Sequence, residues 1–148
     1  MAKAIIFDFM GVIADFDYIS FFNELPLSCK LNGLKIVSAI STNPEIKKAF
    51  SAYQKGQIDR KTFECLIQIY HPKAASALPK LLDRLPSYIH SNQKVISLAK
   101  SLRESGVRTF IISNSIPETE NLIVKACKSG AFEGAILSHK IGVKKPSS

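Results

Sequence analysis

Polar residues follow three apolar segments of this 148-residue chain, and their types together suit one reaction. Asp8 is a carboxylate, Ser113 places a hydroxyl beside Asn114, and Lys144 and Lys145 are adjacent cations. A carboxylate can attack an electrophile, a hydroxyl with backbone donors can hold an oxyanion, and a cation can offset developing charge. Such a group could hold a phosphoryl group against a carboxylate nucleophile. Taken alone, Asp8 could equally begin a turn, because a short apolar run is ambiguous.

Three segments of strand-forming residues must position these groups. Residues 4–7 are apolar, residues 107–112 are largely apolar and β-branched, and residues 135–138 form a third short run. A first run without polar alternation predicts a strand buried on both faces, as in a parallel sheet covered by helices. Because the carboxyl ends of parallel strands share one edge of the sheet, we expect the acid, the hydroxyl and a lysine to meet there.

The segment from residue 17 to residue 88 has helical patterning and no strand signal. Asn43 followed by Pro44 predicts the start of one helix, and Asp59 predicts the start of another. Apolar residues then recur at helical spacing. Aromatic residues of these stripes, which we expect in the interior of the segment, are Phe50, Tyr53, Phe63 and Tyr70.

Two finer predictions concern the ends of helices. Pro26 and Gly33 interrupt residues 18–42, which predicts two short helices there. Ser115 and Glu118 have the Ser-x-x-Glu spacing of a capping box, which predicts a helix that opens directly after the Ser-Asn pair.

The predicted elements follow the order of an α/β fold with an insertion after its first strand. That order is strand, helical block, helix, strand, helix and strand. Right-handed crossovers would make the strands parallel. We therefore predict a Rossmann-like parallel sheet of about three strands, formed by residues 1–16 and 89–148, with residues 17–88 inserted as an all-helical cap.

The composition narrows the classes of partner. The formal net charge is +8, and the basic residues are scattered without interleaved aromatic side chains, which argues against nucleic acid and suits small anionic substrates. No apolar run approaches the roughly 20 residues of a membrane span, so we expect no membrane partner. Cys29, Cys65 and Cys127 have neither metal spacing nor a disulfide framework, which indicates the cytoplasm and three small buried side chains.

The motifs, taken in order, resemble those of the haloacid dehalogenase (HAD) superfamily of hydrolases, in the subclass with a helical cap. The first motif is Phe-Asp-Phe-Met-Gly-Val-Ile at residues 7–13, and the second is Ile-Ile-Ser-Asn at residues 111–114. The third is Gly-Val-Lys-Lys-Pro at residues 142–146, where Lys145 best matches the family lysine. Residues 53–58 also look like part of the family's cap.

The resemblance implies a phosphatase-type mechanism on a small phosphorylated substrate. Asp8 would attack phosphorus and become an aspartyl-phosphate. The Ser113 hydroxyl and the Asn114 backbone N–H would bind the phosphoryl group, with Gly11 also counted as substrate-binding, and Lys145 would offset charge. The family's Mg²⁺ would be held by Asp8, by the backbone carbonyl two residues on, and by acids of a fourth motif.

Two departures from the family pattern bear on activity. Family phosphatases have an aspartate as general acid and base two residues after the nucleophile, where this chain has Met10. Loss of general acid–base help is worth about 10²- to 10⁴-fold in rate. The fourth motif is also absent, as if the chain were truncated before it, so that Asp8 and the Met10 carbonyl would bind Mg²⁺ only weakly.

The missing part of the family sheet would lie beside the first strand, which leaves Ile5–Phe9 as an exposed apolar edge. Such an edge favours a homodimer or strand exchange.

Three functional interpretations stay open. The first is a HAD-like hydrolase of the phosphatase type. The second is a catalytically impaired or inactive HAD-fold remnant or binding module, because of Met10 and the absent fourth motif. The third is a haloacid dehalogenase, whose carboxylate nucleophile needs no metal.

Overall fold

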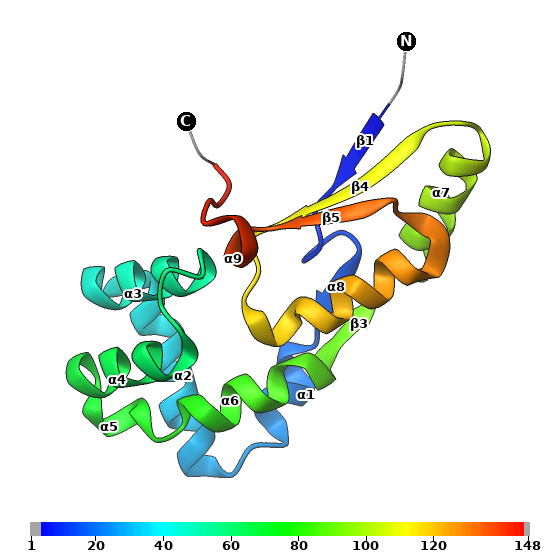
Figure 1. Ribbon diagram of the computed structural model, residues 1–148. Helices are drawn as coiled ribbons and strands as arrows, with labels where there is room; N and C mark the ends of the chain where they lie inside the picture. The colour runs from blue at the N-terminus through cyan, green and yellow to red at the C-terminus, as the bar shows by residue number, and fades with distance from the viewer. Residues whose placement is uncertain (1–3, 147–148) are drawn as a thin grey trace.

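The computed structural model describes residues 4–146 and has a three-stranded parallel sheet in the order β1-β4-β5 (Figure 1). The strands are β1 (Ala4–Phe7), β4 (Arg108–Ser113) and β5 (Gly134–Leu137). Phe7 pairs with Ile111 and Ser113 pairs with Leu137, so the three strands end at the same edge. The predicted α/β fold with a small Rossmann-like sheet is confirmed.

Helices make up almost all of the described chain between the first and second strands of this sheet. They are α1 (Tyr18–Asn23), α2 (Leu27–Thr42), α3 (Pro44–Gln54), α4 (Arg60–Tyr70), α5 (Pro72–Ala75), α6 (Leu78–Arg84) and the 3₁₀ turn η1 (Leu85–Tyr88). The Asn43 side chain accepts hydrogen bonds from the first turn of α3, and Asp59 accepts one from Thr62 in α4, as the sequence predicted. None of the helices in the described part of the chain is long and apolar enough to cross a membrane.

The prediction that Gly33 ends a helix is wrong. Pro26 separates α1 from α2, but α2 then runs unbroken for 16 residues with Gly33 inside it. Gly33 is buried where an added Cβ would lie 3.1 Å from a methyl group of Leu81 on α6. A glycine lets these two helices approach closely, and that packing outweighs its low helix propensity.

Two hydrophobic clusters form, one among the helices of residues 17–88 and one beneath the sheet. Tyr53 and Phe63 are buried in the first cluster, whereas Tyr70 is exposed, which corrects its placement in the interior. Cys29 is buried as expected, but Cys65 is exposed.

A short two-stranded antiparallel sheet, which the sequence did not predict, joins these two regions. It pairs β2 (Ala14–Phe16) with β3 (Ile89–Ser91). At its inner end the Asp17 N–H donates to the carbonyl of Tyr88 over 2.8 Å. The chain therefore enters and leaves the helical region through two paired strands.

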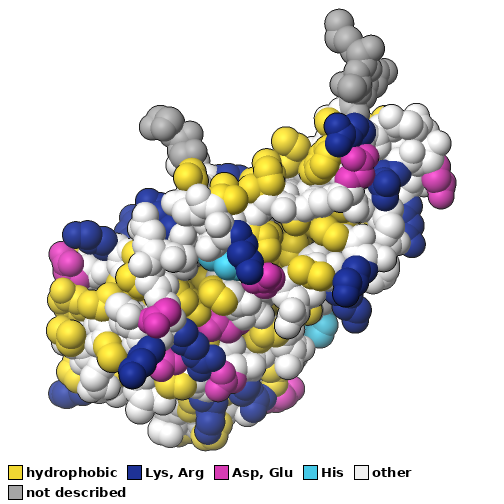
Figure 2. Space-filling view, in the orientation of Figure 1, with side chains coloured by type: hydrophobic (Ala, Val, Ile, Leu, Met, Phe, Trp, Pro, Cys, Tyr) yellow, Lys and Arg dark blue, Asp and Glu magenta, His cyan; other side chains and the backbone are white. Residues whose placement is uncertain are grey.

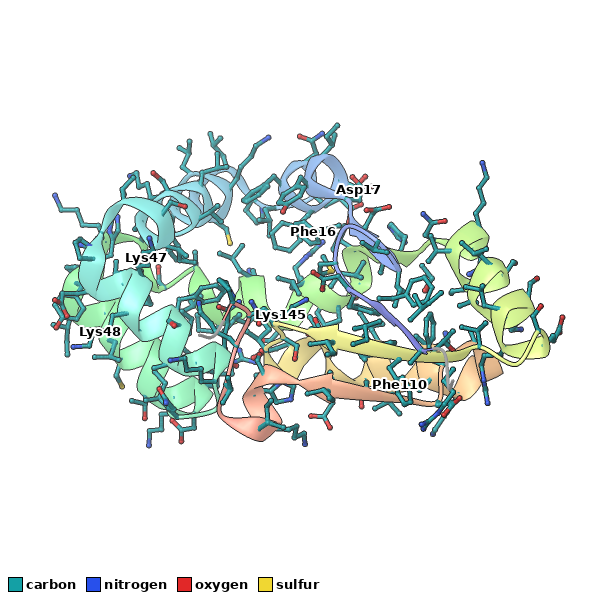
Figure 3. The ribbon with its side chains drawn as sticks, turned by 90° about the horizontal axis from the view of Figure 1, so that it is seen from above. Phe16, Asp17, Lys47, Lys48, Phe110 and Lys145 are labelled. Atoms are coloured by element: carbon teal, nitrogen blue, oxygen red, sulfur yellow. The ribbon has the colours of Figure 1, made fainter. Side chains whose placement is uncertain are left out.

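Within residues 4–146, helices cover one face of the sheet and leave the other open. The covering elements are α7 (Gln93–Glu104), α8 (Glu120–Ala126) and the π-helical turn η3 (Cys127–Ala131). Figure 1 shows them below the sheet, and Figure 3, which looks down on the sheet, shows Phe110 on the uncovered side. In Figure 2, which has the same orientation as Figure 1, hydrophobic side chains gather along the upper edge of the molecule, on the uncovered side of the sheet. Ile6 is 60% exposed, so the prediction of a first strand buried on both faces is wrong.

The unpaired edge is shorter than the predicted Ile5–Phe9. Ile5 and Ile6 are exposed, whereas Phe7 is half-buried and Phe9, in the turn that follows β1, is buried. β1 forms one outer edge of the sheet, with β4 as its one partner among the described strands. Self-association through this edge stays a prediction.

We expect the chain to associate as its concentration rises, since an exposed apolar edge strand pairs readily with another strand. Ile6→Lys should shift the sedimentation coefficient back to that of a monomer. Ile19→Lys is the matched control, because Ile19 is an exposed isoleucine on α1 and gains the same charge. A monomer at all concentrations, or an equal effect of both substitutions, would contradict this edge as the contact.

A chain of side chains binds the short helix α9 (Ser138–Ile141) to α8. The His139 Nε2 atom lies 3.0 Å from Glu120 Oε2, and Lys140 Nζ lies 2.9 Å from Glu120 Oε1. On its other side, His139 Nδ1 lies 2.9 Å from the hydroxyl of Ser115. The hydrogen bond with His139, followed by that with Lys140, holds the pKa of Glu120 below its ordinary value.

A lowered pKa means that Glu120 stabilises the fold while it is ionised. That contribution is fully present above the ordinary Glu pKa of about 4.3 and is lost as the pH falls through the lower folded value. In urea titrations between pH 6 and pH 3, Glu120→Gln should therefore be less stable than the native chain at pH 6, and the gap should close toward pH 3. The exposed Glu104→Gln should show a much smaller gap. A gap that widens as the pH falls would contradict the assignment.

Candidate functional site

Asp8 and Lys145 form an ion pair at the shared carboxyl edge of the strands. Asp8 is the residue directly after β1, and its Oδ2 atom lies 2.9 Å from Lys145 Nζ. The other carboxylate oxygen accepts a hydrogen bond from the Phe9 N–H over 2.7 Å, and Lys145 Nζ also donates to the Ile112 carbonyl over 2.7 Å. The side chains are 49% and 39% exposed, so the pair is open to solvent. Figure 3 shows Lys145 where the helical cap and the sheet meet.

Asn114 positions Lys145 through what we call the Asn114 clamp, the two hydrogen bonds between the Asn114 side chain and the Lys145 backbone. Nδ2 donates to the Lys145 carbonyl, and Oδ1 accepts from the Lys145 N–H, both over 2.7 Å. The clamp selects Lys145 as the partner of Asp8. The neighbouring Lys144 reaches Gln54 of α3 instead, 3.3 Å away.

Gly11 and Met10 lie in the turn after Asp8. The Gly11 N–H donates to the Ala14 carbonyl over 2.8 Å, and φ of +79° at Gly11 suits a residue without a Cβ. Met10, two residues after Asp8 in the chain, is 39% exposed. The structure therefore supplies a thioether where a proton donor would be needed.

Ser113 does not join the exposed group. It is the last residue of β4 and is buried, whereas Asn114, the next residue, faces Lys145. Successive residues of a strand point to opposite faces, which explains the difference. The structure brings Asp8, Asn114 and Lys145 together and places Ser113 behind them, so the phosphoryl-binding role of its hydroxyl stays a prediction.

The donor set at this edge does not fit a magnesium site built by the protein. Residues 4–146 contain no group of three or more His, Cys, Asp or Glu side chains able to hold a metal ion. Asp8 alone offers a carboxylate in the ion pair, and Lys145 already neutralises it. Mg²⁺ prefers an octahedral set of oxygens with one or two carboxylates plus substrate phosphate.

Ser115, His139 and Glu120 have the bonding order of a Ser-His-acid triad, and sequence reasoning missed them. The hydroxyl lies 2.9 Å from Nδ1, and Nε2 lies 3.0 Å from the acid. However, Ser115 is only 4% exposed, and its N–H is bonded to the Ser138 hydroxyl. A substrate carbonyl has no access to a buried nucleophile, so these residues join segments of the fold.

The predicted capping box of Ser115 and Glu118 is wrong. The chain passes through the 3₁₀ turn η2 (Pro117–Thr119) before α8 begins at Glu120. Ser115 bonds to His139, and Glu118 accepts a hydrogen bond from the Tyr53 hydroxyl over 2.6 Å. Tertiary partners therefore take both side chains away from the helix terminus, and no sequence pattern indicated those partners.

Comparison with known proteins finds no matching family model and no match among curated protein sequences. Solved structures do match. A HAD family enzyme of Bacteroides thetaiotaomicron, in complex with magnesium and inorganic phosphate, aligns with a TM-score of 0.64 and 19% identity, over 99% of this chain and 74% of that one. A HAD-like family hydrolase of Porphyromonas gingivalis aligns with a TM-score of 0.61 and 18% identity, over 99% and 71%.

A third solved structure, described as a dehalogenase, aligns with a TM-score of 0.53 and 15% identity, over 99% of this chain and 66% of that one. At such identities the likeness concerns the fold. Each of these structures aligns over 99% of this chain, so the resemblance that the sequence motifs suggested is confirmed for the fold. The chain has the fold of the haloacid dehalogenase superfamily.

Proposed function

We propose that this chain carries a hydrolase site of the phosphatase type, with Asp8 as the nucleophile toward small phosphate esters. The observation that carries the proposal is the 2.9 Å ion pair between Asp8 and Lys145 at the carboxyl edge of the sheet. Ligands of open α/β sheets bind at this edge. The HAD family enzyme of Bacteroides thetaiotaomicron was solved with inorganic phosphate, which supports an anionic substrate for this chain.

The reaction would proceed in two displacements. An Asp8 oxygen attacks phosphorus, the bond from phosphorus to the ester oxygen breaks, and an acyl phosphate forms on Asp8. Water then attacks that phosphate and releases inorganic phosphate, which restores the carboxylate. Lys145 would stay beside the reacting oxygens and offset the added negative charge. Positioning and electrostatics are the main contributions of a protein to such a transfer.

Proton transfer is the weak step of this site. Met10 neither protonates a leaving group nor activates water, so the departing oxygen must take its proton from solvent. We therefore expect slow turnover, confined to activated esters whose leaving groups need no protonation. The Bacteroides thetaiotaomicron enzyme was solved with Mg²⁺, and by resemblance we expect this chain to bind the ion only weakly.

A second candidate is an anion-binding module without turnover. The exposed Met10 and the lone carboxylate favour it, because catalytic groups that act as a unit fail steeply when one is removed. The dehalogenase interpretation has the weaker support of one neighbour, and a short 2-haloacid belongs in the assay for that reason.

Hydrolysis of an activated aryl phosphate, with and without Mg²⁺, tests the proposal. The native chain should show slow hydrolysis that Asp8→Asn abolishes. Met10→Asp should raise the rate by about 10²-fold or more, because it restores general acid–base help. Val12→Asp is the matched control, since Val12 is another exposed residue of the same turn and should leave the rate unchanged.

The outcomes separate the candidates. Binding of inorganic phosphate that Lys145→Met weakens, without hydrolysis even in Met10→Asp, would favour the binding module. Release of halide from the 2-haloacid would favour the dehalogenase. If neither hydrolysis nor phosphate binding depends on Asp8 and Lys145, the proposed site is wrong.

A further inference from the structure

The segment that follows Asn114 leaves the core and enters the helical cap. Ile116 is buried in the cluster of residues that otherwise belong to the cap. Two residues later, Glu118 Oε1 accepts a hydrogen bond from the hydroxyl of Tyr53 on α3 over 2.6 Å. Both contacts join the polypeptide next to the Asn114 clamp to a helix of the cap.

The hydrogen bond between Tyr53 and Glu118 is partly buried, and it leaves the second oxygen of Glu118 without a partner among the described residues. Tyr53 is 0% exposed, and the Glu118 side chain is 10% exposed. Among the described residues, Glu118 Oε2 is buried without a hydrogen-bond partner. A buried acid is costly unless it is paired, so the docking of this segment depends strongly on its donors.

Arg60 is a more distant partner of Glu118 than of two other carboxylates. Its guanidinium lies 3.8 Å from Glu118 Oε1, whereas it lies 2.7 Å from Glu64 and 2.6 Å from Asp83. The pKa of Tyr53 is raised above its ordinary value, first by burial and then by the hydrogen bond with Glu118. The hydroxyl of Tyr53 thus stays protonated and is the close donor to this carboxylate.

We propose that Tyr53 and Glu118 are positioning residues that couple the cap to the Asn114 clamp. Asn114 lies between β4, which is fixed in the sheet, and a segment whose other end is fixed to the cap. If the hydrogen bond is lost, that segment loosens, and Asn114 no longer holds the Lys145 backbone in register with Asp8. Asp8 and Lys145 therefore stay in register only while the segment after Asn114 is bound to the cap.

Residue-level amide hydrogen exchange by NMR on the full chain tests this coupling. The Lys145 N–H is the reporter, because it donates directly to Asn114 Oδ1. Tyr53→Phe keeps the ring that stacks on Phe63 at a centroid distance of 4.9 Å and removes only the hydroxyl. Exchange at Lys145 should become about tenfold to a hundredfold faster, as expected for loss of a hydrogen bond to a buried charge.

Two references distinguish positioning from general destabilisation. The Ile96 N–H, which bonds to the Asn92 carbonyl at the start of α7, lies in the core and should keep its native rate. Tyr70→Phe, which removes an exposed hydroxyl from the same cap, should change neither amide. Equal acceleration at Lys145 and Ile96, or no change at Lys145, would overturn the proposal.

If Tyr53→Phe does not fold, Glu118→Gln decides the question. It keeps an acceptor for Tyr53 but replaces a charge-assisted hydrogen bond with a neutral one, so Lys145 exchange should rise by about twofold to tenfold over that of Ile96. An equal or absent change overturns the coupling. The coupling rests on the proposed function only through the role of Lys145. Amide exchange can be measured without turnover. A chain without hydrolysis can therefore still show the coupling, and an active chain can lack it.

Discussion

The site depends above all on one side-chain amide, that of Asn114. Residues 142–146, which follow α9, pair with no strand of the sheet, and the Asn114 side chain offers Lys145 the donor and acceptor that a neighbouring strand would supply. An exposed ion pair is worth at most about 1 kcal/mol, which is too little to fix a long lysine side chain. The position of the cation beside Asp8 is therefore set by hydrogen bonds to its backbone, and the attraction of the charges follows from that placement.

The helical cap is joined to the core by several contacts of its own. Its hydrophobic cluster includes Ile116 from the core, and the hydroxyl of Ser138 donates to the Gln54 carbonyl of α3 over 2.6 Å. At Gly56, an added Cβ would come within 2.1 Å of the His139 carbonyl, so the cap and α9 meet at backbone distance. Core and cap therefore share both packing and hydrogen bonds.

The features that could be predicted from the sequence are those that local residue patterns determine. Asp8 and one lysine of the pair Lys144 and Lys145 could be placed because strand ends and their order along the chain are readable from apolar runs and turn residues. The choice of Lys145 came from the family resemblance. The exposure of Ile6 could not, because burial depends on which other segments pack on the sheet. Gly33 failed as a helix end for a related reason, since its neighbour Leu81 is distant in sequence. Ser115 has the spacing of a capping box, but its tertiary hydrogen bond with His139 took precedence over the local motif.

The pairing of β2 with β3 has a consequence for how such a chain can change in evolution. The Asp17 N–H and the Tyr88 carbonyl are hydrogen-bonded, and Phe16 faces Ile89 as its strand partner. The helical region thus begins and ends at one point, so its removal would leave two paired strands that a tight turn of a few residues could close. An insertion with adjoining ends can be exchanged, enlarged or shortened without breaking the sheet around it. Variation can therefore concentrate in the cap while the order of the strands stays constant.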